Sequence, residues 1–145
     1  MTKRHDSLRQ LEDEVGILLR RVKPVLAERA ALVHPELQSA SYLMLSWLAQ
    51  QGPVRPALMA ETFGIDKGAI SRQLQHLVDL GLADRSADPQ DGRATVVSAS
   101  ASAIELLQSV REQRREVLNL RLGDWTDADL AEFAATLSRY NTSLS

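Results

Sequence analysis

The 145-residue sequence contains no cysteine. This absence excludes disulfide bonds, thiolate metal ligands and a cysteine-based redox sensor. The sequence also lacks a run of about eighteen apolar residues, the length that a membrane-spanning helix requires, so we expect no membrane partner. Its charged first residues lead directly into an amphipathic segment without the apolar centre of a signal peptide. We therefore expect a cytoplasmic location.

Basic charge is scarce as well. The chain has 17 Lys and Arg residues against 19 Asp and Glu residues, and its formal net charge is −2. Segment 55–93, which contains the clearest motif, has five basic and six acidic side chains and a formal charge of −1. DNA-binding domains usually carry a basic surplus. Binding to DNA would therefore depend on where a few cations lie and not on bulk charge.

Patterns typical of catalytic and metal sites are missing too. The three histidines, His5, His34 and His76, lie far apart, and none has a second ligand at helical spacing. There is no glycine-rich phosphate loop and no recognisable pair of nucleophile and base. With 44% hydrophobic and 25% charged residues, the composition is that of an ordinary globular protein. We therefore expect one domain, 1–145, that is not an enzyme and has no cofactor or metal.

Segment 55–81 predicts a helix-turn-helix. Pro56 suits the first turn of a short helix, Gly64 suits its C-terminal cap, and Asp66 suits the N-cap of the next helix. The buried side of the short helix is expected to comprise Leu58, Met59 and Phe63. The apolar positions of the second helix fall on one face: Ile70, Leu74, Leu77 and Val78. A helix-turn-helix places its second helix in the major groove of DNA.

The opposite face of this second helix carries Gly68, Ala69, Arg72, Gln75 and His76, and Lys67 and Ser71 flank it near the N-terminal end. We expect these residues to contact DNA. The small residues near its start let the backbone approach the groove. Arg72 and Gln75 are expected to reach base edges, and Lys67 and Ser71 to reach phosphates. Arg55, just before the first helix, is also predicted to bind DNA. The alternative interpretation is the solvated face of a surface helix.

Two short strands, 82–85 and 94–98, predict a hairpin after the second helix. The segment between them, Asp-Pro-Gln-Asp-Gly-Arg at 88–93, is rich in residues that favour turns. Arg93 stands on the returning side of this turn and is suited to a narrow minor groove. An ion pair with Asp88 or Asp91 is the alternative for its side chain.

Long helices flank this lobe. In 6–34 an apolar stripe repeats at alternating intervals of three and four residues: Leu8, Leu11, Val15, Leu18, Val22 and Val25. Such a stripe fits either a core-facing helix or a seam with a second chain. Pro24 is expected to kink or divide this helix. Further helices are predicted at 39–51, at 102–122 and after Thr126, where Asp129 completes a capping box. The last helix has its own stripe: Leu130, Phe133, Leu137 and Tyr140.

Three segments, LMAETFGIDKGAISR (58–72), LVDLGL (77–82) and DPQDGR (88–93), resemble the multiple antibiotic resistance regulator (MarR) family of bacterial transcription factors. With the order of helices, the resemblance covers nearly the whole chain. It implies a mainly α fold with a winged helix-turn-helix lobe at 55–98, a two-stranded wing, and dimerisation helices at 6–34 and 102–143. It further implies a homodimer that binds double-stranded DNA at a pseudo-palindromic operator, with Arg93 in the minor groove. Many members repress a nearby gene.

Family members commonly sense small, often aromatic or phenolic, molecules between the dimer helices and the DNA-binding lobe. The residues suggested here for such an effector are Arg20, His34, Tyr42, Trp47 and Phe63, although each also has a packing explanation. Trp47 in particular is expected to pack against a neighbouring helix.

Two features depart from the family pattern. Gln73 replaces an apolar residue, which would either loosen the packing or bring Gln73 into the contact surface. The segment at 98–103 leaves the start of the following helix uncertain. A winged helix that contacts proteins, without a DNA function, is the alternative function, and the weak local basic charge favours it.

Overall fold

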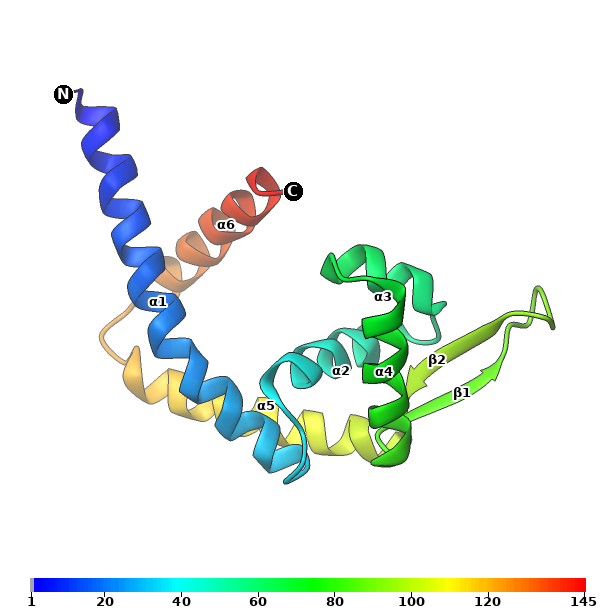
Figure 1. Cartoon of the computed structure of the whole chain (residues 1–145). Helices are drawn as coiled ribbons and strands as arrows, with labels where there is room; N and C mark the ends of the chain where they lie inside the picture. Colours follow the sequence, from blue (N-terminus) through cyan, green and yellow to red (C-terminus); the bar gives the residue numbers. More distant parts are fainter. Residues whose placement is uncertain (1) are drawn as a thin grey trace. The chain divides into compact units, whose positions relative to one another are not determined.

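The computed structural model of the protein describes residues 2–145 (Figure 1). Its elements are α1 (Lys3–Val33), α2 (Ser39–Gln51), α3 (Pro56–Phe63), α4 (Lys67–Asp79), β1 (Ala83–Ala87), β2 (Thr95–Ala99), α5 (Ala101–Arg121) and α6 (Asp127–Ser143). The chain forms two compact units, one up to Val110 and one from Arg111 to Ser145. Among residues 2–145, no helix combines the length and apolar character needed to cross a bilayer.

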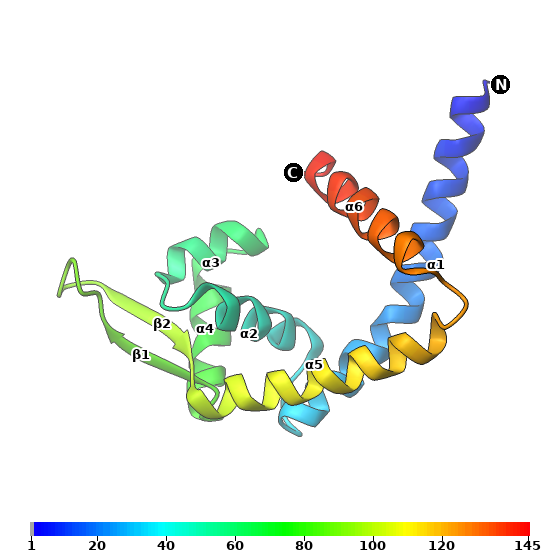
Figure 2. The same cartoon turned by 180° about the vertical axis from the view of Figure 1, so that it is seen from behind.

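Helix α1 runs unbroken through Pro24 for 31 residues, so the predicted division at this proline is wrong. A proline removes only its own hydrogen bond and crowds one carbonyl, and the helical turns on either side remain bonded. The N-terminal part of α1 extends away from α2, α3 and α4 (Figures 1 and 2). Its stripe residues Leu8, Leu11 and Leu18 are 41–49% exposed. The core-facing interpretation therefore fails for this part of the stripe.

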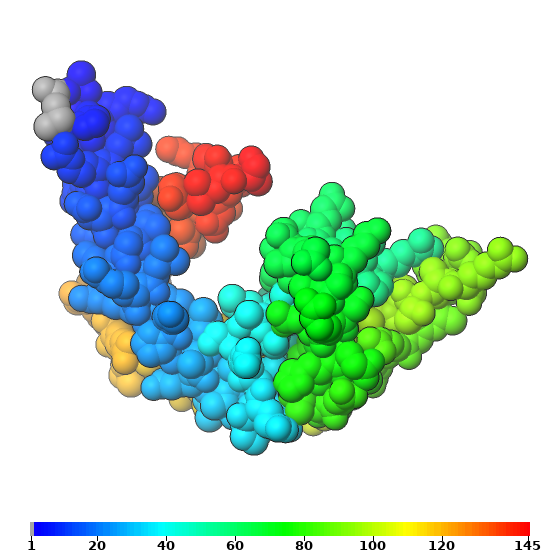
Figure 3. Space-filling view, viewed as in Figure 1, coloured from blue at the N-terminus to red at the C-terminus, as the bar shows by residue number. Residues whose placement is uncertain are grey.

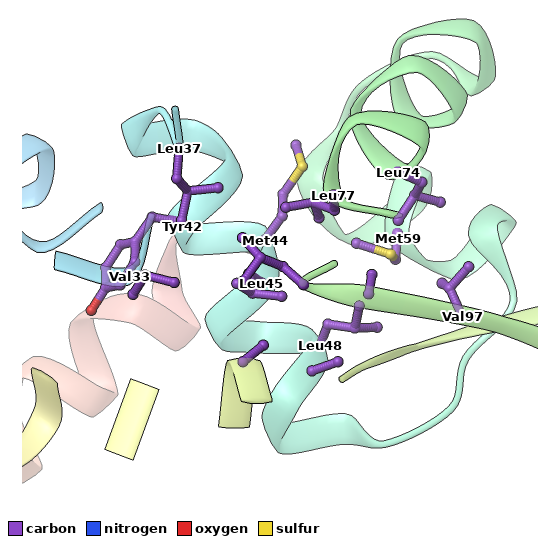
Figure 4. Close-up of a cluster of buried hydrophobic side chains, with 14 of the residues drawn as sticks. Val33, Leu37, Tyr42, Met44, Leu45, Leu48, Met59, Leu74, Leu77 and Val97 are labelled. Atoms are coloured by element: carbon purple, nitrogen blue, oxygen red, sulfur yellow. The ribbon is translucent and has the colours of Figure 1, made fainter. Parts of the chain in front are cut away.

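Helices α2, α3 and α4 and strand β2 surround the hydrophobic core (Figure 4). The largest fully buried side chains are Leu45, Leu48, Met59, Ile70, Leu74, Leu77 and Val97. The predicted apolar face of α4 is thereby confirmed. The prediction for α3 is partly wrong, because Leu58 is 45% exposed while Ala60 is buried. Successive helical residues point about 100° apart, so a helix that buries Met59 and Ala60 turns Leu58 outwards.

Two side-chain contacts tie α2 to its neighbours. The rings of Trp47 and Phe63 meet edge to face with centroids 5.7 Å apart, which confirms the predicted packing role of Trp47. The hydroxyl of Ser41 donates a hydrogen bond of 2.8 Å to Oε1 of Gln73. Gln73 is half-buried and bonded to α2, so it does not join the exposed face of α4. A partly buried hydrogen bond of this kind contributes about 1 kcal/mol.

The wing is an antiparallel hairpin in which Ala83 pairs with Ala99 and Ala87 with Thr95. These strands begin and end one or two residues later than the sequence predicted. Val54, just before α3, exchanges two backbone hydrogen bonds with Val97, of 2.9 and 2.8 Å. It thus adds a one-residue third strand that the sequence did not reveal. The far end of the hairpin projects beyond α3 and α4 into solvent (Figure 3).

Ser100 explains the unusual segment at 98–103. Its hydroxyl accepts the backbone N–H of Ala103 at 3.1 Å and donates to the carbonyl of Gly81 at 2.8 Å. Ser100 thus caps α5 in the manner of serine N-caps and joins its start to the end of α4. In the second unit, Thr126 and Asp129 form the predicted capping box. None of the residues of α6 is buried, and Leu130, Phe133 and Leu137 are 37–53% exposed.

Candidate nucleic-acid interface

Helix α4 presents one face to solvent and one to the core. Asp66 caps it, and its carboxylate accepts the N–H of Ala69 at 2.8 Å. Ala69 is half-buried, and the other predicted contact residues of α4 are exposed: Lys67, Gly68, Ser71, Arg72, Gln75 and His76. The structure therefore brings these residues together on one exposed surface, the α4 face, as the spacing predicted. The burial of Ile70, Leu74 and Leu77 fixes its orientation.

Gly68 leaves room for two charged groups at the start of α4. A Cβ atom placed on Gly68 would lie 3.2 Å from Oδ1 of Asp66 and 3.5 Å from Nη1 of Arg72. The guanidinium of Arg72 therefore lies over the first turn of the helix, beside the capping carboxylate. Arg72 forms no ion pair with any of the described residues. Its side chain is available to a ligand that approaches the N-terminal end of the α4 face.

The amide of Gln75 is engaged at both ends. Its Nε2 donates to Oδ1 of Asp79 at 2.8 Å, and its Oε1 accepts from Nη1 of Arg85 at 2.7 Å. A base contact by Gln75 would therefore have to replace these bonds. Arg85, on β1, was not among the predicted site residues. Its bond to Gln75 joins a strand to a helix, so the pattern of neither segment alone could have indicated it.

His34 and His76 both form contacts in the connection between α1 and α2. Nδ1 of His34 accepts the N–H of Glu36 at 3.0 Å. Nε2 of His76 lies 3.4 Å from the carbonyl oxygen of Glu36. Residues 2–145 contain no group of three or more His, Asp or Glu side chains that could hold a metal ion. His34 and His76 thus serve backbone hydrogen bonding at the C-terminal end of the α4 face.

The wing tip is built by its two aspartates. Oδ1 of Asp88 accepts the N–H of Gln90 at 2.9 Å, and Oδ1 of Asp91 accepts the N–H of Arg93 at 3.1 Å. The backbone N–H of Asp88 donates to the carbonyl of Ala94 and closes the loop. The side chain of Arg93 is exposed and forms no ion pair with the described residues, so the alternative pairing with Asp88 or Asp91 is wrong.

Arg55 is engaged by the wing. Its Nε donates a hydrogen bond to Oδ2 of Asp88 at 2.8 Å, and its Nη2 forms an ion pair with the same oxygen at 2.8 Å. The side chain of Asp88 is 12% exposed and that of Arg55 is 53% exposed. The backbone N–H of Gln90, and after it the Arg55 guanidinium, lower the pKa of Asp88. The pair joins the residue before α3 to the first residue after β1.

The suggested effector residues are only partly brought together. Trp47 and Phe63 are in ring contact, and both are half-buried. Tyr42 is 4% exposed and belongs to the core near Val33 (Figure 4). Arg20 is exposed on α1, and the ring of His34 is engaged by the connecting loop. Packing or local hydrogen bonding therefore accounts for four of the five.

The chain is similar to known transcriptional regulators. The sequence model of the MarR family matches residues 36–94, which span α2, α3, α4 and β1. The chain is 30% identical over 131 residues to YxaD, an HTH-type transcriptional regulator of Bacillus subtilis, and the match covers 90% of each chain. The chain belongs to the MarR family. It is therefore a helix-turn-helix transcriptional regulator and not an enzyme, as predicted.

Solved structures show the same MarR fold. A MepR variant from a multidrug-resistant clinical isolate of S. aureus has a TM-score of 0.76 at 18% identity, over 93% of this chain and 97% of that one. RV1404 of Mycobacterium tuberculosis has a TM-score of 0.76 at 20% identity, over 92% of each chain. These similarities confirm the predicted fold class, a mainly helical protein with a winged helix-turn-helix.

The lowered pKa of Asp88 predicts how the wing tip responds to acid. Because the folded pKa lies below the unfolded value, the charged carboxylate contributes stability above the unfolded pKa. That contribution is lost as the pH falls through the folded value. We expect the carboxyl ¹³C shift of Asp88 to titrate below the usual range for aspartate, and Arg55→Ala to raise its midpoint.

An Asp88→Asn variant is the control for this titration, since it keeps the oxygen that accepts the Gln90 N–H but cannot ionise. The Gln90 amide signal should then lose its acid transition. An unchanged Asp88 midpoint in Arg55→Ala would contradict a contribution of the ion pair to the lowered pKa.

Proposed function

We propose that this MarR-family chain binds a pseudo-palindromic operator in double-stranded DNA as a homodimer, represses transcription there, and is released by a small molecule. The observation that carries the proposal is the pairing of the exposed α4 face with an exposed wing arginine on one lobe. A helix in the major groove and an arginine in the adjacent minor groove read different features of the same site.

Few cations are available for this task. Of the five basic side chains at 55–93, Arg55 is paired with Asp88 and Arg85 is bonded to Gln75. Lys67, Arg72 and Arg93 are exposed and form no ion pair with the described residues. We assign Lys67, with Ser71, to phosphates, Arg72 to base edges and Arg93 to the minor groove. Gly68 and Ala69 permit the close approach, and Gln75 and His76 join only by exchanging their present bonds.

Arg72→Ala should weaken operator binding by roughly 1–3 kcal/mol and relax base preference, as expected for a lost base contact. Arg93→Ala should weaken binding most on sites with A·T-rich flanks. The measurement is fluorescence anisotropy with DNA from upstream of the gene, over a salt series. For the wild type, log affinity should fall steeply with log salt concentration, because neutralised phosphates release counterions.

Lys23→Ala is the matched control, since it removes one exposed cation from α1, outside the proposed interface. Wild-type affinity in both Arg72→Ala and Arg93→Ala would overturn the groove assignment. Flat salt dependence, or no binding at modest salt, would favour the alternative of a winged helix that contacts proteins.

Exposed apolar stripes support the homodimer. The members with the clearest exposure are Leu8, Leu11 and Leu18 in α1 and Leu130, Phe133 and Leu137 in α6. Exposed apolar residues that repeat along one side of a helix are typical of an interface between chains. The heptad-like spacing in α1 fits packing against a second helix. A two-fold dimer that reads DNA places its recognition helices about 34 Å apart, one turn of the duplex.

Leu18→Glu should convert the dimer to monomer at micromolar concentration, since two-fold symmetry places the new charge in the interface twice. An unpaired buried charge costs roughly 3–5 kcal/mol. Light scattering coupled to size-exclusion chromatography measures the change. Gln10→Glu, an equal charge placed off the stripe of the same helix, should remain dimeric. A monomeric wild type would defeat the dimer, and a dimeric Leu18→Glu would defeat this seam.

For the effector we propose a small aromatic or phenolic molecule that binds beside Trp47 and Phe63. This ring pair connects α2 to α3, so a ligand that separates the rings would shift the helix that supports α4. Trp125→Phe leaves Trp47 as the single tryptophan. In that variant, a phenolic acid that binds should change the emission of Trp47 and lower the affinity of the protein for operator. Bound operator should lower the affinity of the protein for the phenolic acid by the same factor. A screen in which no compound lowers operator affinity would contradict the proposal.

A further inference from the structure

The backbone of Arg55, the residue before α3, is fixed on both sides. Val54 is held to β2 by two hydrogen bonds, and Pro56 begins α3 directly after Arg55. The carbonyl of Arg55 accepts the N–H of Leu58 in the first turn of that helix. The side chain of Arg55 is therefore anchored to the helix-turn-helix at its base and reaches the wing with its guanidinium.

The carboxylate of Asp88 divides its two oxygens between two tasks. Oδ1 accepts the N–H of Gln90 and shapes the turn, and Oδ2 makes both contacts with Arg55, the Nε hydrogen bond and the Nη2 ion pair. Neither oxygen is without a donor. The position of the turn is thus coupled directly to the position of the residue before α3.

The outer part of the wing has little other support. Val54 pairs with Val97, which lies opposite Arg85, and the hairpin continues outwards to the pair Ala87 and Thr95. Positions 84–87 of β1 are all exposed. An isolated two-stranded hairpin is marginally stable in water. A tie between Asp88 and the helix-turn-helix, beyond the last support from Val54, therefore restrains the part of the wing that carries Arg93.

We propose that Arg55 and Asp88 are a positioning pair: they hold the wing tip, and with it Arg93, at a fixed place relative to α3 and α4. This inference rests on the proposed DNA-binding function and changes the role of Arg55 from a DNA contact to a support for one. In the competing role, Arg55 contacts a DNA phosphate, and Asp88 pairs with Arg55 only in the absence of DNA. The phosphate would then displace Asp88 from Arg55.

The two roles predict opposite results for Asp88→Asn, which keeps the turn acceptor and removes the charge. For a positioning pair, Asp88→Asn and Arg55→Ala each weaken operator binding roughly two- to fivefold, the range of an exposed ion pair. The double variant is no weaker than either single variant. The salt slope stays at the wild-type value in all three, whereas Lys67→Ala, as the reference for a lost phosphate contact, reduces it by about 0.9. Tighter binding by Asp88→Asn, or a reduced slope in Arg55→Ala, would overturn the positioning role.

A second measurement reads the wing without DNA. The chain has no cysteine, so a nitroxide attached through Gln90→Cys is a single probe of the wing tip, and one attached through Gln108→Cys, an exposed site on α5, is its control. Arg55→Ala and Asp88→Asn should sharpen the spectrum of the wing label and leave that of the control unchanged. Arg55→Lys, which keeps a charged donor, should restore part of the restraint. An unchanged wing spectrum in Arg55→Ala would overturn the proposal, whereas absence of operator binding by the wild type would defeat the proposed function instead.

Discussion

The burial of one face of α4 is the constraint on which the rest of the structure depends. Ile70, Leu74 and Leu77 are almost entirely removed from solvent, and each such side chain contributes about 1.5–3 kcal/mol. A rotation of α4 about its axis would expose these side chains and bury charged ones. The side chains of the opposite face are therefore held outwards by packing, and the Ser41–Gln73 hydrogen bond adds a directional contact on the same inner side.

The acidic side chains of this lobe have local structural tasks, which explains how it can be so short of net positive charge. Asp66 accepts a backbone N–H at the start of α4, and Asp88 and Asp91 accept backbone N–H groups in the wing tip. Asp79 accepts the amide of Gln75. Four of the six carboxylates at 55–93 thus bind donors of the protein itself. The formal charge of −1 gives each of these hydrogen-bonded carboxylates the same weight as an exposed arginine.

The features that the sequence predicted are those decided within a few residues. The caps at Gly64, Asp66 and Thr126 follow from the conformational and hydrogen-bonding preferences of single residues. The side of α4 that faces solvent follows equally directly from helical periodicity.

The features that the sequence did not predict join residues distant along the chain. Ser41 and Gln73 are 32 residues apart, and Arg55 and Asp88 are 33 apart. Such pairs depend on how helices and strands meet, which the pattern of one segment does not contain. The same reason explains Leu58, whose hydrophobicity favours burial but whose direction is set by its neighbours Met59 and Ala60. For the same reason, the stripe of α1 indicated an apolar surface but not the surface against which it packs.

The small number of available cations and the exposed apolar stripes lead to the same conclusion about assembly. One lobe offers Lys67, Arg72 and Arg93, and three neutralised phosphates or fewer give weak binding at moderate salt. In the dimer that we propose, the second half-site is bound in an intramolecular step, so the contributions of the two lobes combine. In the proposed dimer, loss of the seam removes this combination, and loss of the correct position of Arg93 weakens binding at both half-sites. A lobe with more cations would tolerate a loosely held wing, whereas this lobe has few, and for this reason we propose that the Arg55–Asp88 pair holds the wing in place.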